Sequence, residues 1–214
     1  MKVIIVGGVA GGASCAARLR RLDEKAELLM VERGPYVSYA NCGLPYHVGG
    51  VIPQEDKLLV ANAQLFRGFY NFEARTNCEA ISISPKEKTV ELRDVETGDV
   101  TTESYDKLVL SPGAPSYRPD LPGIDLPGIF QVRTVPDART IREWVEGGTS
   151  FLAGMFRYSG IQYAKPVRRA VIVGGGFIGL EMAEHLVELG FNVTLIQTPN
   201  QVLDPVDPEV ARLI

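Results

Sequence analysis

The sequence predicts an α/β fold with two parallel-sheet units and a small antiparallel meander between them. Residues 2–6 form a short apolar run, followed by a glycine-rich turn and a helix-favouring segment. The same pattern returns at residues 169–189, where Gly174 stands 167 residues after Gly7. Residues 79–105 alternate apolar and polar side chains, which is typical of antiparallel strands. We therefore expect a Rossmann-like domain with a meander, followed by the beginning of a second Rossmann-like domain.

The other elements are predicted from apolar runs and from the glycine and proline residues that separate them. In chain order we expect helices at 13–22, 61–74 and 180–189 and one starting near 208, strands at 27–31, 108–110 and 192–196, and an ordered loop at 112–127.

Three segments divide the chain in our prediction. They are a first domain at 1–146, a linker or irregular insertion at 147–165, and an incomplete second domain at 166–214. The second domain has two strands and one helix, whereas a mononucleotide-binding half has about three strands. We therefore expect the sequence to be incomplete relative to its fold.

Composition excludes several functional classes. The 214 residues are 45% hydrophobic and 22% charged, with a net charge of −4, so a basic surface for nucleic acid is not expected. No apolar run reaches the roughly 18 residues of a membrane span. Three cysteines and two histidines occur without metal-ligand spacing, so we expect no metal site and no disulfide scaffold. The reducing cytoplasm is the expected compartment.

The turn at residues 174–179 matches the full G-x-G-x-x-G pattern of dinucleotide sites. Gly174 permits the tight turn, Gly176 lets a pyrophosphate approach the backbone, and Gly179 allows close helix packing. The following helix N-terminus offers free N–H groups to phosphates. Gln197 ends the next strand, where an acid would favour NADH, so the choice between NADH and NADPH stays open.

The N-terminal turn departs from this pattern at one position. Val9 stands where the second glycine is expected, and Gly11 and Gly12 compensate by easing the approach of the backbone. Glu32 lies 20 residues after Gly12, at the end of the next strand, where a carboxylate suits the adenosine ribose. This arrangement is the usual beginning of an FAD-binding domain.

Cys42 is surrounded by polar and turn-forming residues, which favours a thiol near a surface cleft over a buried structural cysteine. A thiol close to a bound flavin passes electrons between that flavin and a sulfur substrate. Cys15 and Cys78 are expected to be inert.

Ser14, Arg18 and Arg21 share one face of the first helix. This face is either solvated or an anion site for a phosphorylated substrate, which two arginines on one stripe suit.

Four runs, at residues 6–13, 38–46, 110–114 and 174–181, together resemble one family. The chain resembles the coenzyme A disulfide reductases and NADH-dependent persulfide reductases, the single-cysteine class of flavoprotein disulfide reductases. The resemblance implies FAD, NADH or NADPH as cofactors, and coenzyme A as a substrate or bound thiol. It also implies a third domain that makes a homodimer.

The resemblance assigns roles to individual residues. Cys42 is expected to be the redox nucleophile, with Asn41 and Ser38 lining the thiol site. His47 stands where two-cysteine relatives place the partner cysteine, so Cys42 would cycle through a mixed disulfide, a persulfide or a sulfenic acid. Glu181 stands where the family places an acid close to the flavin.

Coenzyme A phosphates are expected at Ser14, Arg18 and Arg21, although relatives often have Gln or Lys in place of Arg18. The expected cofactor contacts are Gly7, Gly8, Val9, Ala10, Gly11, Gly12, Glu32, Arg33, Ala80, Ser111, Pro112, Gly113, Arg133, Gly174, Gly176, Phe177, Ile178, Gly179, Glu181 and Gln197.

The leading hypothesis is an FAD-dependent NAD(P)H oxidoreductase acting on coenzyme A disulfide, persulfide or polysulfide, with a small-molecule thiol or disulfide as partner. One alternative is an NADH oxidase or peroxidase with a cysteine sulfenic acid. The other is a non-catalytic nucleotide-binding fragment.

Overall fold

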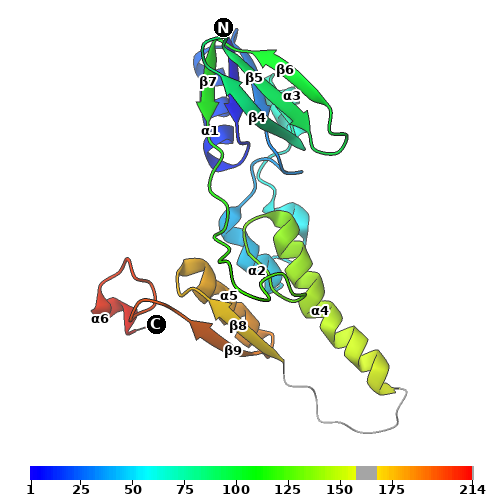
Figure 1. Cartoon of the computed structure of the whole chain (residues 1–214), viewed down its shortest axis with the longest axis vertical. Helices are drawn as coiled ribbons and strands as arrows, with labels where there is room; N and C mark the ends of the chain where they lie inside the picture. The colour runs from blue at the N-terminus through cyan, green and yellow to red at the C-terminus, as the bar shows by residue number, and fades with distance from the viewer. Residues whose placement is uncertain (158–167, 214) are drawn as a thin grey trace. The chain divides into compact units, whose positions relative to one another are not determined.

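The computed structural model describes residues 1–157 and 168–213 and consists of two compact units (Figure 1). The first unit comprises residues 1–40 and 59–115. The second comprises residues 41–58 and 116–214. The segment that carries Cys42 therefore belongs to the second unit, and the domain boundaries drawn from the sequence stay a prediction.

A four-stranded parallel sheet forms the centre of the first unit, in the order β3-β2-β1-β7. Its strands are β1 (Lys2–Val6), β2 (Glu27–Val31), β3 (Glu73–Arg75) and β7 (Lys107–Leu110). The strands predicted at 2–6, 27–31 and 108–110 are confirmed.

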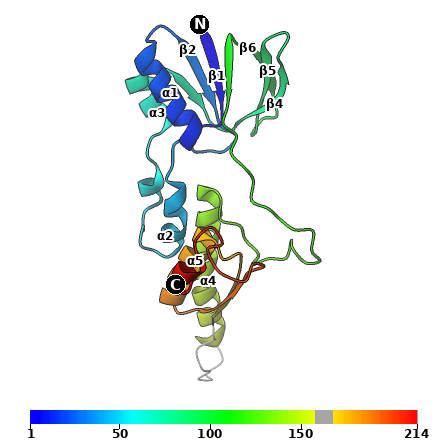
Figure 2. The ribbon, with the colours of Figure 1, turned by 90° about the vertical axis from the view of Figure 1, so that its left-hand side faces the viewer.

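Different layers cover the two faces of this sheet (Figure 2). On one face lie α1 (Ala10–Leu22) and α3 (Ala63–Tyr70). On the other lies the antiparallel meander of β4 (Cys78–Ser84), β5 (Thr89–Asp94) and β6 (Val100–Ser104). The meander predicted at 79–105 is confirmed.

Successive side chains along β1 point to opposite faces of the sheet, which explains this layering. Val3 and Ile5 point toward α1 and α3, and share one buried cluster with Phe66. Ile4 points the other way and shares a second cluster with Val90 and Leu92 of the meander. All three β1 side chains are almost fully buried, so the strand is a central one.

The helix predicted at 61–74 is too long. α3 begins at Ala63, where the side chain of Asn62 accepts a hydrogen bond from the N–H of Leu65 at 2.8 Å. Asn71 ends it in the left-handed conformation, with φ of 49°. The chain then enters β3, because pairing with β2 outweighs the helix preference of residues 73 and 74.

Two parallel strands, β8 (Arg169–Val173) and β9 (Asn192–Ile196), form the sheet of the second unit, as predicted. They are connected by α5 (Phe177–Glu188), which starts three residues before the predicted helix. The unit also contains η1 (Asn41–Gly43), α2 (Leu44–Val48), η2 (Glu55–Leu58), α4 (Val135–Arg157) and α6 (Pro208–Ala211).

Residues 147–157 are helical rather than irregular, because α4 continues through Arg157. The helix begins with a reciprocal capping arrangement between Thr134 and Asp137. The N–H of Asp137 donates to the Thr134 hydroxyl at 3.3 Å, and the N–H of Thr134 donates to the Asp137 carboxylate at 2.8 Å. The last part of the predicted linker, residues 158–165, lies outside the described residues.

Within the described ranges, no group of three His, Cys, Asp or Glu side chains is arranged to hold a metal ion. The helices of those ranges are all too short or too polar to cross a membrane.

Candidate cofactor and thiol sites

The turn after β1 is tight enough to require glycine at two positions. Gly7 has φ of 96°, and a Cβ there would overlap the carbonyl oxygen of Ser111. A Cβ on Gly12 would overlap the carbonyl oxygen of Gly7. Val9, the N-cap of α1, makes no side-chain capping hydrogen bond, so the first N–H groups of the helix are available to an anion.

Glu32 is fixed beside this turn by two backbone donors. Its Oε2 atom accepts the N–H of Gly8 at 2.8 Å, and its Oε1 atom accepts the N–H of Gly34 at 2.9 Å. Each carboxylate oxygen retains a lone pair for a ribose hydroxyl. The turn, the free helix end and the held carboxylate together fit the adenosine and pyrophosphate of FAD.

The other predicted FAD contacts lie in several environments. The N–H of Ser111 donates to the carbonyl oxygen of Val6 at 2.7 Å, which aligns the two strand ends. Arg33 is exposed and pairs with Glu79 at 3.8 Å. Ala80 packs against the core on the meander side. Pro112 and Gly113 are exposed beyond Ser111, and Arg133 is exposed in the second unit.

The turn after β8 repeats the first one. Gly174 has φ of 112°, and a Cβ on Gly179 would overlap its carbonyl oxygen. The N–H of Gly175 donates to Oε1 of Gln197 at 2.8 Å. Nothing lies within 4 Å of a Cβ built on Gly176, which leaves room for a pyrophosphate.

Phe177 and Ile178 are exposed in the first turn of α5, and Glu181 is half-buried one turn later. All three belong to α5, the helix that directly follows the predicted phosphate-binding turn, so they lie near that turn.

A cavity of about 380 Å³ in the first unit brings the glycine turn together with two predicted substrate residues. Val9 and Ala10 of the turn line it, as do Ser14 of α1 and Ser38. Ser38 is held there because its N–H donates to the carbonyl oxygen of Gly8 at 2.9 Å. Aromatic side chains of α3, including Tyr70, complete the wall.

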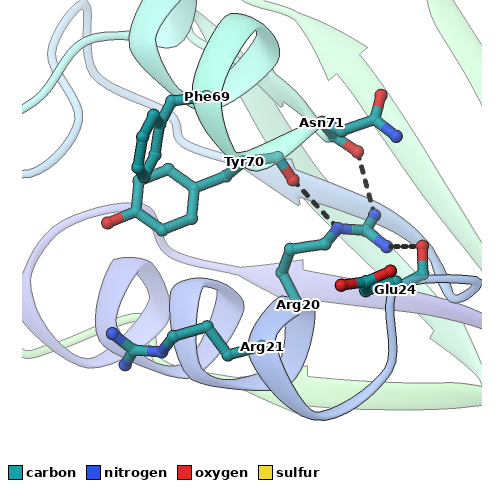
Figure 3. Close-up of a pocket in the computed structure, with 6 residues that line it drawn as sticks. All are labelled: Arg20, Arg21, Glu24, Phe69, Tyr70 and Asn71. Atoms are coloured by element: carbon teal, nitrogen blue, oxygen red, sulfur yellow. Dashed lines mark hydrogen bonds between the residues drawn. The ribbon is translucent and has the colours of Figure 1, made fainter.

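A second cavity, of about 620 Å³, lies between the ends of α1 and α3 and is also lined by Tyr70 (Figure 3). Arg21, predicted to bind phosphate, lines it, whereas Arg18 is exposed and lines neither cavity. Sequence reasoning missed Phe69 and Tyr70. Their only local signal is an aromatic pair at the end of a helix.

Arg20 and Arg21 differ in how their guanidinium groups are used. Arg20 donates to the carbonyl oxygens of Tyr70 at 2.9 Å, Asn71 at 2.9 Å and Glu24 at 2.6 Å (Figure 3). Arg21 forms no hydrogen bond or ion pair with the residues that the structure describes. Arg20 therefore stabilises the wall of this cavity, and the guanidinium of Arg21 has no partner among the described residues.

Cys42 is exposed in η1, directly before α2. His47, at the place of a second cysteine, is buried, and its Nδ1 lies 2.8 Å from the carbonyl oxygen of Ile52. The guanidinium of Arg142, in α4, donates to the carbonyl oxygens of His47 at 3.4 Å and Pro53 at 2.8 Å. His47 therefore anchors α2 to the following loop and to α4. Asn41 is half-buried beside Cys42, and the grouping of both residues with Ser38 stays a prediction.

Two glycine turns at the ends of parallel strands, each with a side chain held at the second strand end, define a dinucleotide-binding α/β protein. The chain belongs to the pyridine nucleotide-disulphide oxidoreductase family, whose pattern matches residues 1–214.

Named relatives agree with this family. Coenzyme A disulfide reductase of Staphylococcus haemolyticus is 33% identical over 213 residues, covering 100% of this chain and 44% of that protein. The reduced CoADR-RHD structure of Bacillus anthracis has a TM-score of 0.88 at 44% identity, covering 99% of this chain and 35% of that one. A NAD-dependent persulfide reductase from A. fulgidus has a TM-score of 0.82 at 33% identity, covering 100% and 36%. The chain thus spans less than half the length of these relatives.

Proposed function

We propose that this chain carries the FAD site and the redox cysteine of an NAD(P)H-dependent oxidoreductase that reduces coenzyme A disulfide, a persulfide or a polysulfide. The cofactors would be FAD at the first glycine turn and NADH or NADPH at the second. A homodimer in the cytoplasm is part of the proposal. Free thiols at all three cysteines support the cytoplasmic part.

The cavity beside the first glycine turn carries this proposal. It joins Val9 and Ala10, at the predicted pyrophosphate site, with Ser14 and Ser38, which the family resemblance assigns to the thiol substrate. The adjoining cavity adds Arg21 as a partner for a phosphate of coenzyme A.

Chain connectivity supports the role of Cys42. It stands four positions after Ser38, so their Cα atoms lie within about 14 Å of each other, whatever the placement of the two units. Asn41 is the intervening polar side chain, and Cys42 is exposed, as a thiol that attacks a dissolved substrate must be.

The chemistry of Cys42 needs no second cysteine. Its thiolate attacks one sulfur of a disulfide, the substrate S–S bond breaks, and one thiolate leaves while a mixed disulfide forms. Two electrons then break the mixed disulfide, which returns the Cys42 thiolate and releases the second thiol. FAD, when bound, supplies the route by which NAD(P)H delivers those electrons.

The visible absorption spectrum of the purified chain tests the cofactor proposal. Flavin bands that bleach on titration with NADH or NADPH and leave a long-wavelength thiolate–flavin band are expected. A colourless protein that takes up no added FAD would refute the proposal and favour a fragment without redox function.

Replacement of Cys42 by Ser tests the thiol chemistry. Disulfide turnover is expected to be lost, while reduction of the flavin by NAD(P)H is retained. Cys78→Ser is the matched control, because burial raises the pKa of the Cys78 thiol and keeps it protonated. Retained disulfide turnover in Cys42→Ser would contradict the assigned role, and oxygen consumption that depends on Cys42 would favour the NADH oxidase alternative.

A further inference from the structure

We infer that Gln197 opens the second glycine turn to a 2′-phosphorylated nucleotide, so that NADPH binds at least about one-tenth as tightly as NADH. This inference rests on the proposed cofactor function and names the cofactor class that the second site takes.

The orientation of the Gln197 carboxamide is set by the backbone. The N–H of Gly175 needs an acceptor, and Oε1 of Gln197 supplies it at 2.8 Å. A carboxamide has one oxygen acceptor and one NH₂ donor. Gly175 uses one lone pair of that oxygen, so the carboxamide keeps a second lone pair and its NH₂ donor for a ligand, and it carries no charge.

The equivalent position of the first unit shows what an acid does there. The N–H of Gly8 donates to Oε2 of Glu32 at 2.8 Å, as the N–H of Gly175 donates to Gln197. Glu32 accepts a second backbone donor, from Gly34, on its other oxygen. Each turn thus holds its side chain by the same backbone hydrogen bond. The Glu32 carboxylate is charged and can only accept hydrogen bonds, whereas the Gln197 carboxamide is neutral and can also donate them.

This difference decides the chemistry toward the ribose. A carboxylate accepts hydrogen bonds from the 2′-hydroxyl and repels a 2′-phosphate. The NH₂ of Gln197 donates either to the 2′-hydroxyl oxygen or to a phosphate oxygen. The loop at residues 197–207 contributes two acids, Asp204 and Asp207, and no Lys or Arg, so it provides no cation that would select for the phosphate.

Calorimetric titration of the 214-residue chain with NAD⁺ and NADP⁺ tests the inference without turnover. In the unchanged chain the NADP⁺ affinity is expected within about tenfold of the NAD⁺ affinity. Gln197→Glu is expected to retain NAD⁺ binding and to weaken NADP⁺ binding about 30-fold or more, because two negative groups then meet. The new carboxylate can still accept the N–H of Gly175, as Glu32 accepts that of Gly8, so the turn is preserved.

Asn200→Asp is the matched control, since it makes the same amide-to-acid change at an exposed position of the same loop. It is expected to change NADP⁺ affinity less than threefold, because an exposed charge is screened. Circular dichroism verifies that both variants fold.

Each outcome has one meaning. NADP⁺ binding more than tenfold weaker than NAD⁺ binding in the unchanged chain would overturn the inference and leave the proposed function intact. An equal loss of NADP⁺ affinity in Gln197→Glu and Asn200→Asp, or no loss in Gln197→Glu, would also overturn it. Failure of both nucleotides to bind would overturn the proposed function together with the inference.

Discussion

The imidazole ring of His185 lies directly against Gly49: a Cβ on Gly49 would come within 2.6 Å of the ring carbon Cγ. The same ring meets the edge of Tyr46 with 4.7 Å between centroids. His185 belongs to α5, and Tyr46 and Gly49 belong to α2 and its C-cap. The short helix that follows Cys42 is therefore seated on the helix that follows the second glycine turn.

Replacement of Gly49 by Ala tests this contact. The added methyl group overlaps a buried ring, so we expect the free energy of unfolding to fall by about 1–3 kcal/mol. In a His185→Ala background the same substitution should cost much less, because the ring is gone. Chemical denaturation of the two single variants and the double variant measures this coupling. Additive losses would show that the ring does not limit the space at Gly49.

Gly147→Ala is a control in which the free energy of unfolding is expected to rise rather than fall. Gly147 lies exposed in α4, and nothing lies within 4 Å of a Cβ built there. We expect the substitution to stabilise the chain by about 0.5–1 kcal/mol through helix propensity.

Gly12 and Gly11 are adjacent glycines with different steric demands. Gly12→Ala is expected to reduce stability by about 3 kcal/mol or more, because the new Cβ overlaps the carbonyl oxygen of Gly7. Gly11→Ala should leave stability unchanged or slightly higher, because the nearest atom to its Cβ is the Ser111 Oγ at 3.4 Å. Thermal unfolding compares the two. A similar melting temperature for both variants would contradict the predicted close approach in the first turn.

Arg20 and Arg21 give a second matched pair. Arg21→Ala is expected to weaken binding of coenzyme A about tenfold while leaving stability unchanged, since its guanidinium has no partner among the described residues. Arg20→Ala should instead reduce stability, because four backbone carbonyls at the end of α3 and after α1 lose their donor. Calorimetry with coenzyme A and denaturation separate the two effects. Equal coenzyme A affinity in Arg21→Ala and the unchanged chain would exclude a phosphate contact there.

Acid should weaken the first unit through a network of charges that joins the parallel sheet to strand β6 of the meander. Hydrogen bonds from Lys2, and then from Arg75, lower the pKa of Glu103, and a hydrogen bond from Arg75 lowers the pKa of Glu73. A carboxyl whose pKa is lower in the folded state stabilises that state above the ordinary glutamate value of 4.5. This stability is lost as the pH falls below that value.

Unfolding followed from pH 7 to pH 3 measures the effect. Arg75→Met is expected to remove only about 0.5–1 kcal/mol of stability at pH 7, because solvent screens these half-exposed ion pairs. The loss of stability below pH 4.5 should also become less steep, because the Arg75 hydrogen bonds no longer lower the pKa of Glu73 and Glu103. Glu91→Gln, which removes an exposed carboxylate of β5, should leave the slope unchanged. An unchanged slope in Arg75→Met would mean that the network does not contribute.

Most of the fold could be predicted from local patterns. The runs at residues 2–6, 27–31 and 169–173 are short, apolar and bounded by turn residues, which few other structures permit. The errors fell where long-range pairing or helix capping overrode local signals. Residues 73 and 74 pair with β2 as part of strand β3. Residues 147–157 continue a helix that begins at the Thr134–Asp137 capping pair, at least ten positions earlier in the chain.

The sequence by itself determined the chemistry that is available: a cysteine, Cys42, in a polar run without a partner cysteine five residues later, and two glycine turns, each followed by a polar side chain at a strand end. Only the tertiary structure decided how equivalent residues are used. Arg20 donates to the carbonyl oxygens of residues 70 and 71, Arg21 has no partner among the described residues, and Gly175 donates to the oxygen of Gln197. These choices depend on partners about 20 to 50 positions away, and packing, rather than local pattern, brings such partners together.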